Sequence, residues 1–109
     1  MGRLLYGGQE MEVEIDDRAL AHLQIVITSK LRRGESFLFS WTDALSAGSG
    51  RSSIWIDHGI PLYFRYSSGG TAAINRDWIS ALMLSANTPT GLRFLAEPGF
   101  ATAPPRSSV

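Results

Sequence analysis

Few residues of this chain could do covalent or acid–base chemistry. The sequence contains one lysine, Lys30, two histidines, His22 and His58, and no cysteine, which excludes a thiol nucleophile. Lys30, Arg32 and Arg33 could contact nucleic-acid phosphates, or they could complement the negative end of a helix dipole. We favour the dipole interpretation, because ten acidic residues balance ten basic ones and no global field attracts a polyanion.

Other polar clusters match known sites only in part. Residues 48–53 resemble a phosphate-binding loop, but Arg51 stands where that loop needs a lysine, and the segment joins two expected strands. We interpret it as a hairpin loop and keep Arg51 only as a weak candidate for phosphate contact. Asp57 and His58 are adjacent and should point apart, while His22 should lie at the boundary of an apolar helix stripe. No third ligand accompanies them, so we expect no metal and no cofactor.

Hydrophobic periodicity predicts the elements that would position these groups. Met11, Val13 and Ile15 alternate with glutamates, which indicates a strand with one solvent-exposed face. Glu12 and Glu14 on that face could also hold a divalent cation. The expected strands cover residues 3–6, 11–15, 37–41, 52–57, 62–66 and 91–97. The expected helices lie between Asp16 and Gly34 and between Asn75 and Asn87. Asp16 and Asp17 can cap the first helix, Gly34 suits the position after its end, and Asn75 can cap the second helix.

The resulting order, β-β-α-β-β-β-α-β, indicates an α+β fold. We expect an antiparallel or mixed sheet with both helices packed on one face. Short links between the three central strands favour an antiparallel meander.

Length and composition predict one soluble domain. A chain of 109 residues that is 44% hydrophobic suits a single globular core, which we place at residues 1–97, with a flexible tail at residues 98–109. No apolar run approaches the ~20 residues needed to cross a bilayer, and the N-terminal apolar stretch is too short for a signal peptide. We therefore expect a cytoplasmic protein that makes no membrane contact.

One expected surface could recognise a partner. If the helices cover one side of the sheet, Trp55, Tyr63, Arg65 and Arg93 point away from them. Aromatic and arginine side chains together can anchor a protein partner or a second copy of the chain, and they can also stack on single-stranded nucleic acid. A second layer formed by the N-terminal hairpin or the tail could equally cover them. We predict a non-catalytic binding module, with protein or self-association ahead of nucleic acid.

Four segments carry a family resemblance. They are Asp-Asp-Arg-Ala-Leu-Ala-His-Leu-Gln from Asp16, Lys-Leu-Arg-Arg-Gly-Glu-Ser-Phe from Lys30, Gly-Arg-Ser-Ser-Ile-Trp-Ile from Gly50 and Ile-Asn-Arg-Asp-Trp-Ile from Ile74. Together they resemble a family of short actinobacterial proteins of unknown function, over roughly residues 1–98. Members of that family are often labelled "ATP-dependent DNA ligase", but the resemblance implies no catalytic residues.

The ligase label can be compared with the chemistry of this chain. ATP-dependent ligases resemble one another in a Lys-x-Asp-Gly motif, whose lysine amine is adenylated. Leu31, Arg32 and Arg33 follow Lys30, so the motif is absent. We therefore expect no autonomous ligase activity and no enzyme, while an accessory role beside a ligase stays open.

Overall fold

The computed structural model describes residues 1–8, 11–43 and 50–108, and it has the predicted α+β fold. Its helices are α1 (Asp17–Arg32) and α2 (Arg76–Ala86). Its strands are β1 (Gly2–Tyr6), β2 (Met11–Ile15), β3 (Phe37–Thr42), β4 (Arg51–Ile56), β5 (Leu62–Arg65), β6 (Leu92–Arg93) and β7 (Arg106–Ser108). The order agrees with the prediction as far as β6, and β7 follows as an additional strand.

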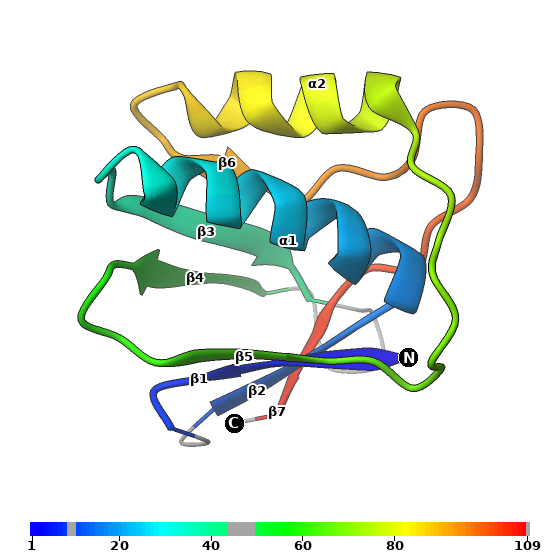
Figure 1. The fold of residues 1–109 in the computed structure, drawn as a ribbon, viewed down its shortest axis with the longest axis horizontal. Coiled ribbons are helices and arrows are strands. Elements are labelled where there is room, and N and C mark those ends of the chain that lie inside the picture. The colour runs from blue at the N-terminus through cyan, green and yellow to red at the C-terminus, as the bar shows by residue number, and fades with distance from the viewer. Residues whose placement is uncertain (9–10, 44–49, 109) are drawn as a thin grey trace.

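The strands form two sheets. One has the order β5-β1-β2-β7 and is antiparallel throughout, and the other has the order β4-β3-β6, in which β3 pairs antiparallel with β4 and parallel with β6. In Figure 1 both helices lie on one side, with β3 and β4 behind and below α1 and the other sheet at the bottom. Helix α2 packs beside α1 and against β6.

The predicted antiparallel meander of β3, β4 and β5 is wrong. Strand β5 leaves β4 and pairs with β1, where Phe64 lies opposite Leu4. The main-chain N–H of Gly7 also donates to the carbonyl oxygen of Pro61 at 3.0 Å, which holds the start of β5 beside the end of β1. A short link limits the distance between two strand ends, but it does not decide which sheet the second strand joins.

The caps predicted from sequence explain where the helices begin. The Asp16 carboxylate accepts a hydrogen bond from the Ala19 main chain at 3.2 Å and begins α1. The Asn75 side chain accepts from the main-chain N–H groups of Asp77 and Trp78 at 3.0 and 3.3 Å and begins α2. Gly34 follows α1 with a φ of 76°, as expected for the residue that ends a helix.

The core lies between the helices and the inner faces of both sheets. Alternation sends every second residue of each strand inward, and the helices contribute one stripe each. The large side chains that are less than 2% exposed are Trp78, Phe39, Leu4, Ile15, Leu20, Leu23, Ile27, Ile56, Leu82, Leu92, His22 and Val13.

Part of the expected tail forms strand β7. Arg106 lies opposite Glu14, and Ser107 opposite Val13, in an antiparallel pair with β2. The Ser107 hydroxyl donates to Asp43 Oδ1 at 2.8 Å, and this bond is the main reason that the pKa of Asp43 lies below its ordinary value. Arg-Ser-Ser has no apolar alternation, so its sequence did not predict a strand. The strand expected at residues 91–97 is limited to Leu92–Arg93.

Neither described helix has the length and apolar character needed to span a bilayer.

Candidate functional site

Trp55 lies on the surface of the β4-β3-β6 sheet, as the sequence predicted. Its neighbours Ile54 and Ile56 point into the core, so the pleat turns Trp55 outward and leaves it 49% exposed. Leu38 lies directly opposite Trp55 on β3 and is 38% exposed. These two side chains form an apolar pair, called here the Trp55–Leu38 patch.

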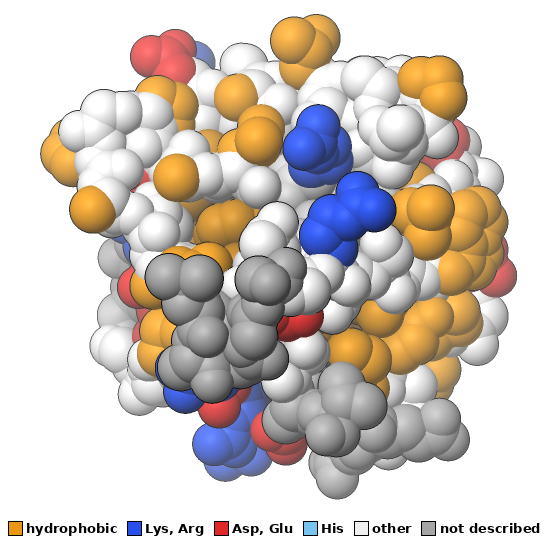
Figure 2. Space-filling model, turned by 180° about the vertical axis from the view of Figure 1, so that it is seen from behind, with side chains coloured by type: hydrophobic (Ala, Val, Ile, Leu, Met, Phe, Trp, Pro, Cys, Tyr) orange, Lys and Arg blue, Asp and Glu red, His pale blue; other side chains and the backbone are white. Residues whose placement is uncertain are grey.

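Two arginines share this outer face with the patch. Arg51 lies opposite Thr42, and Arg93 lies beside Ser40, so pairing and pleat bring both to the side that carries Trp55. Both arginines are exposed. The sheet lies behind α1 in Figure 1, and the view from behind in Figure 2 shows hydrophobic side chains gathered beside lysine or arginine side chains.

Tyr63 and Arg65 lie on a different surface, so the prediction of one shared face is wrong. Both belong to β5, where Tyr63 pairs with Leu5 and Arg65 with Arg3 in the other sheet. Tyr63 is 56% exposed, so it does point outward. The four predicted binding residues therefore divide between two sheets, with Trp55 and Arg93 on one of them.

A hollow of about 360 Å³ adjoins the Trp55–Leu38 patch. Its wall includes Gly91, which has a φ of 83° and whose Cβ, if present, would lie 2.5 Å from the Leu38 carbonyl oxygen. Only glycine fits this close approach of two main chains. The hollow therefore depends on that residue, which holds the α2–β6 link against β3.

Lys30 lines the same hollow, but its amine is paired inside the protein. The side chain is 5% exposed, and Nζ donates to Asn87 Oδ1 at 2.8 Å and lies 2.6 Å from Glu35 Oε1. The ammonium also lies 5.9 Å from the centre of the Phe37 ring. The Lys30 hydrogen bond is the main reason that the pKa of Glu35 is below its ordinary value. This geometry favours a structural role for Lys30 over phosphate contact.

Of the three bases at the end of α1, Lys30 and Arg33 both contact Glu35, whereas Arg32 lies apart from them. Arg33 Nε lies 3.4 Å from Glu35 Oε2, and Arg33 Nη2 is 3.9 Å from the sulfur of Met83. Arg32 is exposed and lines a separate groove along α1. Lys30, Arg32 and Arg33 therefore do not form a single basic patch.

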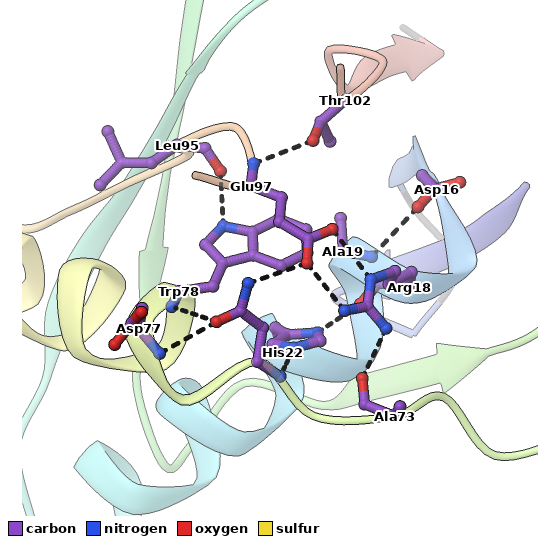
Figure 3. Close-up of polar contacts among 11 residues, drawn as sticks. Asp16, Arg18, Ala19, His22, Ala73, Asp77, Trp78, Leu95, Glu97 and Thr102 are labelled. Carbon is purple, nitrogen blue, oxygen red and sulfur yellow. Dashed lines mark hydrogen bonds and ion pairs between the residues drawn. The ribbon is translucent and has the colours of Figure 1, made fainter. Parts of the chain in front are cut away.

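A second polar centre, which the sequence did not predict, surrounds Glu97 (Figure 3). Arg18 donates from Nε to Glu97 Oε1 at 2.9 Å and from Nη2 to Oε2 at 2.7 Å, and its Nη1 donates to the Ala73 carbonyl oxygen at 2.5 Å. The Asn75 amide nitrogen donates to Glu97 Oε2 at 2.9 Å. The Arg18 and Asn75 bonds lower the pKa of Glu97 to about 2. No motif connects these residues, which lie far apart in the sequence.

His22 belongs to this centre and is fully buried, so the predicted boundary position is wrong. Its Nε2 accepts the main-chain N–H of Asn75 at 2.9 Å, and its Nδ1 lies 2.7 Å from the Arg18 carbonyl oxygen. Nε2 is thus the acceptor and Nδ1 carries the hydrogen. The ring packs on Trp78 with centroids 4.5 Å apart (Figure 3). His22 and Glu97 use their polar atoms within the fold, so the centre joins α1 to α2 and has a structural role. We call Arg18, His22, Asn75 and Glu97 together the Arg18–Glu97 clasp.

Asp57 and His58 also differ from expectation, because they do not point apart. His58 Nδ1 lies 3.8 Å from Asp57 Oδ1, and His58 Nε2 lies 2.8 Å from the Leu31 carbonyl oxygen. Asp57 accepts the Ser36 hydroxyl at 2.5 Å, and this bond is the main reason that its pKa is lowered. Within the described part of the chain, no group of three acidic, histidine or cysteine side chains could hold a metal ion. Residues 44–49 lie outside the described residues, and with them the first two positions of the predicted loop at 48–53, whereas residues 51–53 belong to β4.

Comparison with known proteins gives a family without an assigned activity. A family model described as "Domain of unknown function (DUF7882)" matches residues 1–97. The chain belongs to this family. No curated protein and no solved structure matches the chain. The part shared with the family includes Trp55 and the Arg18–Glu97 clasp, and it ends before β7.

Proposed function

We propose that this domain is a non-catalytic binding module whose contact surface is the outer face of the β4-β3-β6 sheet. A protein, including a second copy of the chain, is the favoured partner. The observation that carries the proposal is the Trp55–Leu38 patch, in which Trp55 is 49% exposed and Leu38 is 38% exposed on one sheet face. Tryptophan is among the residues that contribute most to protein interfaces, because it buries a large and rigid area.

The internal pairing of the polar groups supports binding over catalysis. Lys30 forms an ion pair with Glu35 and donates a hydrogen bond to Asn87, and His22 and Glu97 are held within the clasp. A general base or a nucleophile has to reach a substrate. The exposed features of the sheet face are instead an aromatic ring, an aliphatic side chain and arginines.

Variants of two exposed aromatic residues test the proposal. Trp55→Ala should lower the affinity of the domain for its partner by about tenfold or more, as expected for a central interface residue. Sedimentation measures this affinity for self-association, and partner capture measures it for another protein. Tyr63→Ala is the matched control, because Tyr63 is 56% exposed on the other sheet. A monomeric protein whose partner capture is unchanged by Trp55→Ala would contradict the proposal.

Single-stranded nucleic acid is the second candidate partner. Arg51 and Arg93 favour it, because they lie on the same face as Trp55 and could contact phosphates while the indole stacks on a base. This arrangement replaces the combination of Trp55 with Tyr63 and Arg65 that the sequence suggested. The balance of ten basic and ten acidic residues places this candidate second.

We further propose that the domain has no autonomous ligase activity, despite the label carried by similar actinobacterial proteins. Lys30 lacks the Lys-x-Asp-Gly context, and its amine is paired with Glu35 at 2.6 Å. Incubation with radiolabelled ATP should therefore leave no label on the protein in a denaturing gel. Radioactive label that is present on the natural protein and disappears in Lys30→Arg would overturn this statement.

We also propose a cytoplasmic location, which fits a chain without cysteine and can be checked by cell fractionation.

A further inference from the structure

A groove of about 800 Å³ runs between α1 and the segment that joins β5 to α2. Figure 1 shows this segment rising from β5 past the N-terminal end of α1 to the start of α2. The α1 residues that line the groove recur at helical spacing, so they belong to one face of the helix. They are Ala21, Gln24, Ile25, Thr28, Ser29 and Arg32. The volume lies in the range of small-molecule sites, which is roughly 300–1,000 Å³.

The middle of the groove is apolar and open. Ile25 on α1 is 38% exposed, and Ile74 on the facing segment is 48% exposed. Ala21 and Ala72 add small apolar side chains to the same lining. Two exposed isoleucines in one concave surface offer an apolar ligand more contact than either side chain would on a flat surface.

The two ends of the groove differ in charge. At one end the Asp17 carboxylate accepts hydrogen bonds from the Ser67 hydroxyl at 2.8 Å and from the main-chain N–H groups of Ser67 and Ser68 at 3.2 and 3.1 Å. Burial raises the pKa of Asp17, but these bonds outweigh it, so the carboxylate stays ionised and repels an anion. At the other end, the exposed Arg32 guanidinium makes no hydrogen bond or ion pair with the residues that the structure describes.

We propose that this groove binds an anionic amphiphile, a carboxylate with a medium-length acyl chain. Its carboxylate pairs with Arg32, and its chain lies along Ile25 and Ile74. Arg32 lies on the same helix face as Ile25 but two turns further along, about 10 Å along the axis from the helical rise, so head and chain contact different residues. Gln24 adds a polar group to the lining beside Ile25, because its Oε1 accepts the Tyr66 hydroxyl at 2.5 Å and its amide nitrogen stays available as a donor.

A titration of the isotope-labelled protein with monomeric dodecanoate tests this site by NMR. The amide signals of Ile25, Thr28 and Gly69 should shift, and dodecylamine, which has the same chain and the opposite charge, should bind at least about tenfold more weakly. Arg32→Gln should weaken dodecanoate binding by about tenfold, because a charged hydrogen bond is lost. Ile25→Ser should weaken both ligands, since both use the apolar chain.

Arg33→Gln is the matched control, because Arg33 carries the same charge one residue away but contacts Glu35 and Met83. It should leave the dodecanoate affinity unchanged. Equal losses in Arg32→Gln and Arg33→Gln, equal binding of the two ligands, or no shift along α1 would each overturn the proposal. Trp55→Ala should not alter dodecanoate binding, so the proposal for the groove and the proposal for the sheet face can be refuted independently.

Discussion

Arg18 donates hydrogen bonds to both carboxylate oxygens of Glu97, at 2.9 and 2.7 Å, although the two residues are 79 positions apart. The pair joins the first turn of α1 to the segment that follows β6 (Figure 3). Asn75 donates to the same carboxylate and also begins α2, so one acidic side chain connects both helix starts. Its ionisation therefore matters for the whole helical layer.

Acid should weaken the fold through Glu97. Its pKa falls from the ordinary 4.5 to about 2 in the folded protein, so its stabilising contribution is complete above pH 4.5 and is lost as the pH falls toward 2. Denaturant unfolding measured across this range should show a decline that is shallower in Glu97→Gln, which should also be less stable at neutral pH. Asp17, Glu35, Asp43 and Asp57 have lowered pKa values too, so some decline should persist in the variant. An identical pH profile in both proteins would contradict the assignment.

Two glycines should respond differently to the same substitution. Gly34 and Gly91 have φ values of 76° and 83°, but an added Cβ meets nothing within 4 Å at Gly34 and lies 2.5 Å from the Leu38 oxygen at Gly91. Gly34→Ala should lower the free energy of unfolding by about 1–2 kcal/mol from backbone strain alone. Gly91→Ala should lower it by about 1–3 kcal/mol more, because the main chains must separate. Equal losses in chemical denaturation would show that this contact relaxes freely.

Removal of residues 106–109 should destabilise the domain. The truncation deletes the pairing of β7 with β2 and the Ser107 bond to Asp43, and we expect the free energy of unfolding to fall by about 2 kcal/mol. Ser107→Ala should have a smaller effect, because it keeps the strand pairing. Both can be measured by thermal and denaturant unfolding. Unchanged stability after truncation would instead favour the flexible tail that the sequence suggested for residues 98–109.

Tryptophan fluorescence can separate the two candidate partners. Trp41 and Trp78 are 3% and 1% exposed, so a stacking ligand should quench mainly Trp55. If single-stranded nucleic acid binds the sheet face, mixed oligonucleotides should quench the emission at about 50 mM salt, and the quenching should weaken as salt rises. Arg93→Gln should reduce the salt dependence, while Arg65→Gln, on the other sheet, should leave it unchanged. Absence of quenching at low salt would exclude this partner and leave the protein interface.

Local features of the fold were predictable because they depend on neighbouring residues. Asp16 and Asn75 were expected to cap the helices, and both do so through their own side chains. The alternation around Trp55 placed that residue on the outside of a strand, because successive side chains in a strand point to opposite faces. The shortage of groups for covalent chemistry was also evident from composition alone.

Pairing between distant segments was not predictable, and it changed the candidate site. The choice of β1 as the partner of β5 separated Tyr63 and Arg65 from Trp55, although the strands are consecutive in the chain. Lys30 looked like a surface base at a helix end, yet Glu35 and Asn87 enclose its amine. Glu35 is close to Lys30 in the chain, but nothing in the local sequence marks Asn87, which is 57 positions away, as the second partner.

By itself, the sequence determined the α+β class, the helix boundaries and the side of its strand on which Trp55 lies, because capping and pleat act within a few residues. Only the tertiary structure decided that the strands divide into two sheets, that Arg18 meets Glu97, and that a groove forms along α1 beside Ile25. Those features depend on which segments bury their apolar faces together, and that choice is made by packing across the whole domain.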